Sequence, residues 1–264
     1  MSTMDISKPN AGRIYDYILG GHHNFEADRR AADFLVKRIP FLPKAMRMQR
    51  WCLQDLAQEL TAKRGYDLIV DFASGLPTQD NIHAVVPAGT TVIYSDSDPV
   101  VVEYARQILH GLNDVHIFQA DARRPEELLN RPEVQAIIGE RRDVGLVLWG
   151  VTTFLTDDEI AHIARYLYDW AGPRTTLAFE AQVALDSSDS PMIADLLKAY
   201  EQTGSKMHIR PLARFHELIR PWRVDGGQFT SLLEWHGFDP SLMGEEERRL
   251  AGPGGGNYGA YLVK

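Results

Sequence analysis

Residues 68 to 78 read Leu-Ile-Val-Asp-Phe-Ala-Ser-Gly-Leu-Pro-Thr and pass from apolar residues, through an acidic residue, into small residues. The first three residues are typical of a buried parallel strand, and Asp71 falls at its carboxyl end. After it, Ala73, Ser74 and Gly75 leave little side-chain bulk between the backbone and a ligand. Because open α/β sheets bind ligands outside such strand ends, this stretch predicts a binding turn.

A second run of strand-forming residues also ends in an acidic residue. Residues 91 to 94 read Thr-Val-Ile-Tyr and lead to Asp96, which lies 25 residues after Asp71. In nucleotide-binding α/β units, a carboxylate about 20 residues past the glycine turn accepts hydrogen bonds from the ribose. We therefore assign Asp96, with Ser97 beside it, as the predicted ribose ligand. Asp98 competes for this role, but an aspartate followed by proline is also typical of a helix N-cap.

The third acidic strand end follows residues 115 to 118, Val-His-Ile-Phe, and contains Asp121 and Ala122. Three acidic ends favour a neutral or cationic ligand that donates hydrogen bonds. The glycine patterns that cradle pyrophosphate or triphosphate, Gly-x-Gly-x-x-Gly after a strand and Gly-x-x-x-x-Gly-Lys-Ser/Thr, are missing. An adenosine that carries a sulfonium and an amino acid tail fits this pattern better than a dinucleotide does.

In this interpretation each strand end has an assigned partner and a structural alternative. Asp71 holds the ammonium of the amino acid tail, directly or through water, or it only caps the turn that follows. Asp121 and Ala122 meet the amino group and ring of adenine, or Asp121 is the N-cap of a helix that begins near Pro125. Trp149 ends a fourth predicted strand, and it belongs to the core, lines the substrate pocket or faces the sulfonium by cation–π attraction.

The N-terminal segment, residues 10 to 25, carries the most specific pattern, because it contains Arg-Ile-Tyr-Asp-Tyr-Ile-Leu-Gly-Gly followed by His-His-Asn-Phe. Together with residues 71 to 78 and 94 to 100, it resembles the actinobacterial S-adenosylmethionine-dependent methyltransferases once catalogued as a domain of unknown function. The resemblance implies S-adenosyl-L-methionine (SAM) as the cofactor. In one departure, Phe72 and Ala73 replace the Ile and first Gly of the family's usual Asp-Ile-Gly-Thr-Gly-Leu-Pro-Thr, so the Ala73 methyl group reduces the clearance for the methionine tail.

The same N-terminal segment is predicted to form a helix that ends at Gly20 and Gly21. We interpret it as a lid, in which Tyr17, Gly21 and Asn24 close over the cofactor and Arg13 neutralises the cofactor's carboxylate. The alternative is a structural cap whose tyrosine rings cover the edge of the sheet.

The sequence assigns no catalytic residue. Methyl transfer is an in-line displacement at a carbon that the sulfonium already activates, so positioning supplies most of the acceleration. If the acceptor is an oxygen or carbon acid, His22 or His23 is a candidate base, although adjacent loop histidines are often plain surface residues. No grouping of His, Cys and Asp has metal-ligand spacing, so we expect no metal.

Alternating predicted strands and helices indicate an α/β fold. The resemblance implies a Rossmann-like, seven-stranded methyltransferase sheet, mostly parallel, with helices on both faces and a final antiparallel strand, residues 258 to 263, at one edge. Predicted helices at residues 26 to 38 and 42 to 63 pack on it. We expect residues 1–64 to form an N-terminal helical cap or lid and residues 65–264 the SAM-binding core, in one folding unit.

Composition narrows the expected partners. The 264-residue chain has a net charge of −8 and a pI near 5.6, which disfavours nucleic acid binding. No apolar run approaches the roughly 18 residues of a membrane span, and no signal pattern is present, so we expect a cytoplasmic protein with no membrane partner. The single cysteine, Cys52, excludes an internal disulfide.

We therefore expect a SAM-dependent methyltransferase that acts on a small-molecule acceptor. The Asn/Asp-Pro-Pro-aromatic signature of base-modifying methyltransferases is absent after the fourth predicted strand, where Trp149-Gly150-Val151 stands instead. The alternative is a non-catalytic or regulatory SAM-binding protein, and a nicotinamide-dependent oxidoreductase is disfavoured by the missing glycine fingerprint. The acceptor, the attacked atom and the oligomeric state stay open.

Overall fold

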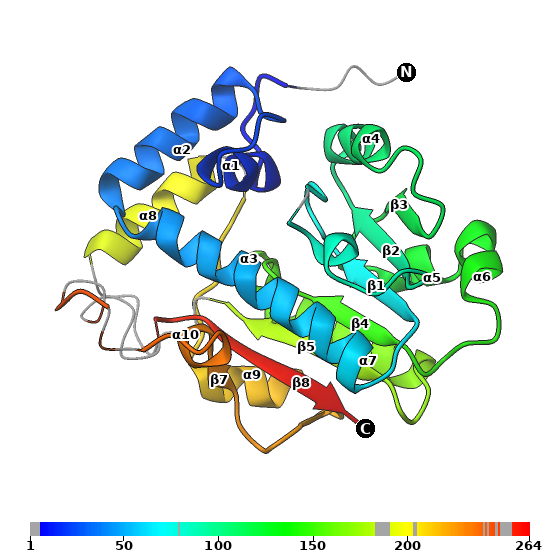
Figure 1. Ribbon diagram of the computed structural model, residues 1–264. Coiled ribbons are helices and arrows are strands. Elements are labelled where there is room, and N and C mark those ends of the chain that lie inside the picture. The colour runs from blue at the N-terminus through cyan, green and yellow to red at the C-terminus, as the bar shows by residue number, and fades with distance from the viewer. Residues whose placement is uncertain are drawn as a thin grey trace.

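An eight-stranded sheet forms the centre of the protein in the computed structural model (Figure 1). The structure describes residues 6–78, 80–182, 191–202, 205–239, 241, 243–245, 248 and 255–264. The strands follow the order β3 (Val115–Gln119), β2 (Thr91–Asp96), β1 (Leu68–Phe72), β4 (Gly145–Leu148), β5 (Thr176–Ala181), β8 (Tyr258–Val263) and β6 (Arg223–Val224), with β7 (Thr230–Ser231) also paired to β8.

The five strands from β3 to β5 run parallel, and β8 runs antiparallel to its neighbours. The mostly parallel α/β sheet predicted from the sequence is therefore confirmed. Two details differ from the expectation. The described sheet has eight strands instead of seven, and β8 lies between β5 and the short strands β6 and β7 instead of at the edge. Strands β6 and β7 contain two residues each, too few to leave a periodic pattern in the sequence.

The helices predicted at residues 26 to 38 and 42 to 63 are confirmed. The described helices precede the sheet or connect its strands. They are α1 (Ala11–Ile18), α2 (Glu26–Arg38), α3 (Leu42–Gln58) with a π-helical extension (Glu59–Lys63), α4 (Pro99–Ile108), α5 (Pro125–Leu129), α6 (Pro132–Ile138), α7 (Asp157–Trp170), α8 (Pro191–Gln202), α9 (Leu212–Leu218) and α10 (Leu232–Trp235). Short 3₁₀ turns span Ile82–Ala84 and Thr152–Phe154.

Helix starts follow the capping chemistry that the sequence predicted. The Asp98 side chain accepts a hydrogen bond from the Val100 amide at 2.8 Å and begins α4, with Pro99 at its first position. Thr156 and Glu159 form a capping box at the start of α7. Asp98 therefore has a structural task, which leaves Asp96 as the acidic residue of this strand end with a free role.

Both faces of the sheet are covered, because alternate strand residues point to opposite sides. In β1, Leu68 and Val70 belong to a core cluster with residues of α7 and α9. Ile69 belongs to a second cluster, in which α3 contributes Leu53 and Leu56. The apolar run that predicted a parallel strand is thus buried on both sides.

A helical layer made of α1, α2 and α8 lies at the carboxyl ends of the parallel strands (Figure 1). These helices share a small core that includes Ile14, Leu35 and Tyr200. The division into residues 1–64 and 65–264 stays a prediction, and α3, which falls in the first part, packs directly on the sheet.

Candidate functional site

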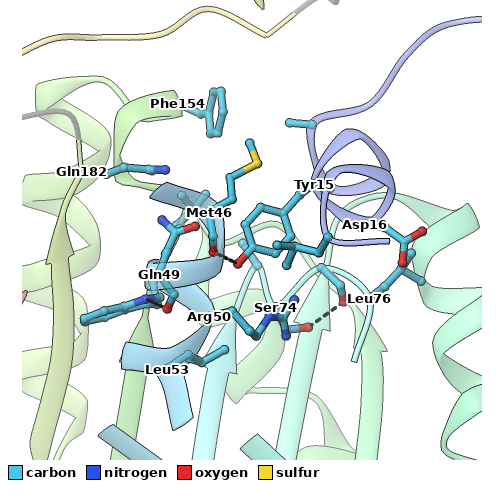
Figure 2. Close-up of a pocket in the computed structure, with 18 of the residues that line it drawn as sticks. Tyr15, Asp16, Met46, Gln49, Arg50, Leu53, Ser74, Leu76, Phe154 and Gln182 are labelled. Atoms are coloured by element: carbon cyan, nitrogen blue, oxygen red, sulfur yellow. Dashed lines mark hydrogen bonds between the residues drawn. The ribbon is translucent and has the colours of Figure 1, made fainter. Parts of the chain in front are cut away.

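A cavity of about 500 Å³ lies where the strand ends meet the helical layer (Figure 2). Its size falls within the roughly 300 to 1,000 Å³ typical of small-ligand pockets. The walls come from α1, α3, the turn after β1, and the ends of β2 and β4. Seven residues predicted for the site line it, namely Gly21, Ala73, Ser74, Gly75, Asp96, Ser97 and Trp149.

The turn after β1 is held in place by Asp96. One carboxylate oxygen of Asp96 accepts a hydrogen bond from the Gly75 amide at 3.0 Å, and the other accepts one from the Asp98 amide at 2.9 Å. Burial raises the pKa of Asp96 to about 6, although the two amides oppose the shift. Ala73 has a φ of +57°, so the chain accepts a left-handed conformation at a residue other than glycine. The turn and the predicted ribose ligand thus form one unit.

Asp71 lies in β1, beneath the turn that Asp96 holds. It is not among the described residues that line the cavity. Its side chain is buried, which raises its pKa well above the ordinary value, while the nearby Arg50 opposes that rise. Its contact with the cofactor's ammonium stays a prediction.

The N-terminal motif forms a turn that closes on its own aspartate. One carboxylate oxygen of Asp16 accepts hydrogen bonds from the His23 amide and from Asn24 Nδ2, both at 2.9 Å. A Cβ atom on Gly21 would overlap the Asp16 carboxylate, so no larger residue fits there. This turn fixes α1 so that Gly12, Tyr15 and Asp16 line the cavity. The segment therefore has the position of the predicted lid, with other residues facing inward.

Three residues assigned to the lid do not line the cavity. The Arg13 guanidinium is engaged by Asp28 at 2.9 Å and Asp98 at 2.7 Å, so it ties α1 to α2 and to the start of α4. The Tyr17 hydroxyl lies 3.4 Å from Asp33 on α2. Asn24 donates to Asp16 within the turn. The sequence does not show which oppositely charged residues in α2 and at the start of α4 pair with Arg13.

The residues assigned to adenine are also away from the cavity wall. Both oxygens of Asp121 accept hydrogen bonds from the Arg123 side chain at 2.9 Å, and this pairing lowers the pKa of Asp121. Ala122 is buried in the core. The structural alternative for Asp121 is wrong, because Arg124 occupies the N-cap position of α5, and the contact of Asp121 with adenine stays a prediction.

The two candidate bases are not part of the cavity lining either. His22 is exposed, and the ring of His23 packs against Tyr104 with the ring centroids 5.2 Å apart. Among the described residues, no group of three or more His, Cys, Asp or Glu side chains is arranged to hold a metal ion.

Arg50 on α3 is the main cavity residue that the sequence analysis missed. It is 5% exposed, and its Nε and Nη1 atoms are buried without a hydrogen-bond partner in the described structure. Its guanidinium carbon lies 5.2 Å from the centre of the Tyr15 ring, whose hydroxyl donates to the Met46 carbonyl at 3.0 Å. A buried cation with free donors is costly unless a ligand pairs with it, so Arg50 indicates an anionic group in the cavity.

A second missed pair joins α3 to the end of β5. Gln49 Nε2 lies 2.9 and 2.8 Å from the two carboxylate oxygens of Glu180, and the Gly150 amide donates to one of them at 2.8 Å. Glu180 is fully buried, and burial raises its pKa to about 7. Gln49 also contacts Trp149, because the indole nitrogen of Trp149 donates to the main-chain carbonyl of Gln49 at 3.1 Å.

The sequence of α3 contains a signal for two of the missed residues, Gln49 and Arg50. Gln49 and Arg50 interrupt a helix face whose other members, such as Leu53 and Leu56, are buried. Polar residues on an apolar helical face need buried partners, and such partners are found either in the protein or in a ligand.

The residues of the cavity fit SAM. The free donors of Arg50 suit its carboxylate, and Asp96 and the small residues of the β1 turn suit its ribose and tail. In the part of the chain that the structure describes, no helix has the length and apolar character to span a membrane.

Comparisons with known proteins agree with this geometry. Residues 1–246 match the family model described as S-adenosyl methyltransferase. The structure of a candidate methyltransferase from Thermobifida fusca YX has a TM-score of 0.86 and 27% identity, and the alignment covers 99% of this chain and 97% of that one. A DUF574 family protein from Streptomyces avermitilis MA-4680 has a TM-score of 0.86 and 23% identity, with 99% and 100% covered.

A more distant likeness concerns the fold alone. Human N-acetylserotonin methyltransferase, solved in complex with SAM, has a TM-score of 0.51 and 15% identity over 96% of this chain and 63% of that one. The search of curated proteins gave no match. The fold is the Rossmann-like methyltransferase fold, and the chain belongs to the S-adenosyl methyltransferase family, whose members use SAM.

Proposed function

We propose that the protein transfers the methyl group of SAM to a small-molecule acceptor by in-line displacement. The observation that carries the proposal is that groups suited to SAM and a largely apolar remainder line the same cavity. When one cavity holds donor and acceptor, the fold aligns them and converts a bimolecular reaction into an effectively unimolecular one.

We place the donor along the ends of β1 and β2. Asp96 is fixed by two backbone amides and has lone pairs left for the ribose hydroxyls. Arg50 offers two unpartnered nitrogens to the carboxylate of the methionine tail, in a charge-assisted pairing. Asp71, buried beside Arg50, remains the predicted partner of the ammonium.

The reaction needs alignment more than acid–base chemistry. SAM supplies a methyl group on a positively charged sulfur. With SAM bound, a lone pair of the acceptor would form the new bond to the methyl carbon as the carbon–sulfur bond breaks, and the electron pair of that bond would stay on sulfur to give SAH. The methylated product would release its proton to solvent on leaving the cavity. We assign to α1, through Tyr15 and Asp16, the role of covering the cavity and limiting water there. The predicted cation–π contact of Trp149 with the sulfonium belongs to the same arrangement.

A small acceptor is supported by the rest of the lining. Besides the residues suited to SAM, the lining includes the apolar side chains of Met46, Phe154 and Met207. A net charge of −8 disfavours a polyanion as substrate, so we propose that the protein does not act on nucleic acid. We also propose a cytoplasmic location. Proteins of the same fold include mitomycin 7-O-methyltransferase, with a TM-score of 0.52 and 15% identity, whose name states a small acceptor.

The proposal is tested in two steps on the full chain. Calorimetric titration with SAM and S-adenosylhomocysteine (SAH) should give binding of both. Product formation is then measured with phenols, amines and carboxylates as acceptors. Binding without turnover on any acceptor would favour the non-catalytic, regulatory alternative.

Asp96→Ala tests the ribose assignment, with Asp121→Ala as the matched control. We expect Asp96→Ala to weaken SAH binding by about 1.5 to 3 kcal/mol, because hydrogen bonds to a charged group are lost. Asp121→Ala should leave the affinity close to that of the wild type, since Asp121 pairs with Arg123 outside the cavity. Equal losses in both variants would refute the assignment.

A further inference from the structure

The half of the cavity over β4 and β5 contains a polar group with a fixed direction. In this doubly wound sheet the strand order reverses between β1 and β4, and the proposed function puts the donor at this point and toward β2. Gln49 lies on the other side, next to Gly150 at the end of β4 and Glu180 at the end of β5. Figure 2 shows its amide facing the cavity between Met46 and Gln182.

Glu180 decides which end of the Gln49 amide faces the cavity. The Gly150 amide is a donor only, so the Glu180 oxygen that it contacts must accept. When Glu180 is ionised, both of its oxygens only accept, and Gln49 Nε2 lies within hydrogen-bond distance of both, so the NH₂ end of the amide is turned toward the carboxylate. The Gln49 oxygen then points away from Glu180, and it has no hydrogen-bond partner among the described residues. The cavity thus presents an oriented acceptor at this point, beside Gln182, whose Oε1 atom is also without a partner among the described residues.

Apolar side chains lie beside this acceptor. Figure 2 shows Met46 and Phe154 near Gln49, and the Trp149 indole donates to the main-chain carbonyl of Gln49. A ligand that fits here therefore combines an apolar body, which can pack on Phe154, with at least one group that donates a hydrogen bond. A ligand that covers the Gln49 oxygen without offering a donor removes that oxygen from water at a cost, so the site discriminates against such ligands.

We propose that Gln49, oriented by Glu180, selects the methyl acceptor, and that the acceptor is an aromatic molecule with a hydroxyl or N–H group that donates to the Gln49 oxygen. This inference rests on the proposed function, since it needs SAM in the neighbouring half of the cavity. Gln49 contacts the acceptor directly, and Glu180 is a positioning residue that acts through Gln49.

The test compares two probes with the same ring system on the SAH-loaded protein. The probes are 2-naphthol, which donates a hydrogen bond, and 2-methoxynaphthalene, which is one methyl group larger and only accepts one. Dissociation constants are measured by calorimetry at pH 8.5, where Glu180 is ionised. We expect the wild type to bind 2-naphthol at least tenfold more tightly than 2-methoxynaphthalene. In Gln49→Leu this ratio should fall to about one, and in the exposed control Gln58→Leu it should stay at the wild-type value.

Glu180→Gln gives the sharper outcome, because it is nearly isosteric. The new side chain keeps its oxygen on the Gly150 amide and places an NH₂ group where Gln49 Nε2 now meets the second carboxylate oxygen at 2.9 Å. This NH₂ group favours the oxygen end of the Gln49 amide, so the fixed orientation of the acceptor is lost and the preference for 2-naphthol should fall at least threefold. A merely structural role of Glu180 would lower both affinities together and leave their ratio unchanged.

Other outcomes separate this inference from the proposed function. Equal binding of the two probes by the wild type, or binding of neither, would overturn the inference. A tenfold or greater loss of SAH affinity in Gln49→Leu would place Gln49 in the donor site and overturn it too. Failure of the wild type to bind SAH would instead overturn the proposed function.

Discussion

The two halves of the cavity are built in different ways. The donor half, defined by Ala73 to Gly75, Asp96 and Arg50, draws most of its residues from short contiguous motifs at the ends of β1 and β2. The acceptor half is defined by Gln49, Trp149 and Glu180. It joins residues that are far apart in sequence, since Gln49 and Glu180 are separated by 131 positions. The donor half therefore follows from local sequence, whereas the acceptor half follows from how α3 packs on the sheet.

The largest effect should come from Arg50→Met, which removes the one residue of the donor half that α3 supplies. We expect SAH binding to weaken by at least about 3 kcal/mol, more than a hundredfold, because the carboxylate of SAH loses its charged partner in a buried site. Calorimetry with SAH measures this change. Arg47→Met, an exposed arginine on the same helix, should bind SAH like the wild type. A loss below threefold in Arg50→Met would remove α3 from the donor half.

In the acceptor half, the titration of Glu180 should make the free energy of unfolding depend on pH. The pKa of Glu180 rises from 4.5 to about 7 on burial, so the folded state prefers the protonated form. Stability that is present below pH 4.5 is then lost as the pH rises toward 7, by about 3 kcal/mol. Tyr15 and Cys52, which face the Glu180 charge, have raised pKa values and stay protonated in this range.

Glu180→Gln removes this titration and tests the assignment. The difference in unfolding free energy between variant and wild type should grow in favour of the variant from pH 4.5 to 7 and then level off. Urea unfolding at several pH values measures it, and exposed Glu133→Gln corrects for the change in net charge. A difference that does not vary with pH would show that Glu180 does not titrate as described.

The position of α1, which covers the donor half, depends on the close approach of Gly21 to Asp16. In Gly21→Ala, the new Cβ overlaps a carboxylate that two hydrogen bonds hold in place. We expect a loss of about 1 to 3 kcal/mol in stability, as in overpacked sites, and weaker SAH binding because α1 shifts. The double variant Gly21→Ala/Asp16→Ala should lose less free energy of unfolding than the sum of the losses in the two single variants, because both substitutions affect the same contact. Additive losses would contradict this contact.

The smallest effect should come from Ala73→Gly in the donor turn. Ala73 has a φ of +57°, a conformation that costs an L-residue roughly 1 to 2 kcal/mol and that glycine adopts freely. We expect the variant to be more stable by up to about 1 kcal/mol and to bind SAH slightly better. Ala161→Gly within α7 should destabilise by about 1 kcal/mol instead. Destabilisation of equal size in both variants would show that Ala73 is not strained.

The sequence predicted the parts of the fold that depend on local chemistry. The β1 and β2 strands and the start of α4 at Asp98 are confirmed because burial on both faces and N-capping leave local patterns. The position of β8 between β5 and the short strands was not predictable, because β6 and β7 owe their pairing to β8 and not to a pattern of their own.

The same distinction applies to the site. Asp96 and the β1 turn lie on the cavity wall as placed from sequence, because the end of a parallel strand fixes where they point. Arg13 and Asp121 were assigned to the cofactor, yet both pair with oppositely charged neighbours, and a sequence does not show which charges meet. Arg50 and Glu180 were missed because their environment exists only after α3 and β5 come together.

A crystal structure of the protein with SAH would locate the adenosyl group and its partners. We expect the ribose hydroxyls to lie within hydrogen-bond distance of Asp96, the SAH carboxylate to pair with Arg50, and the sulfur to face the half of the cavity that holds Gln49 and Trp149. An adenosyl group bound elsewhere, with the strand ends closed by the protein's own side chains and Arg50 still without a partner, would contradict this expectation.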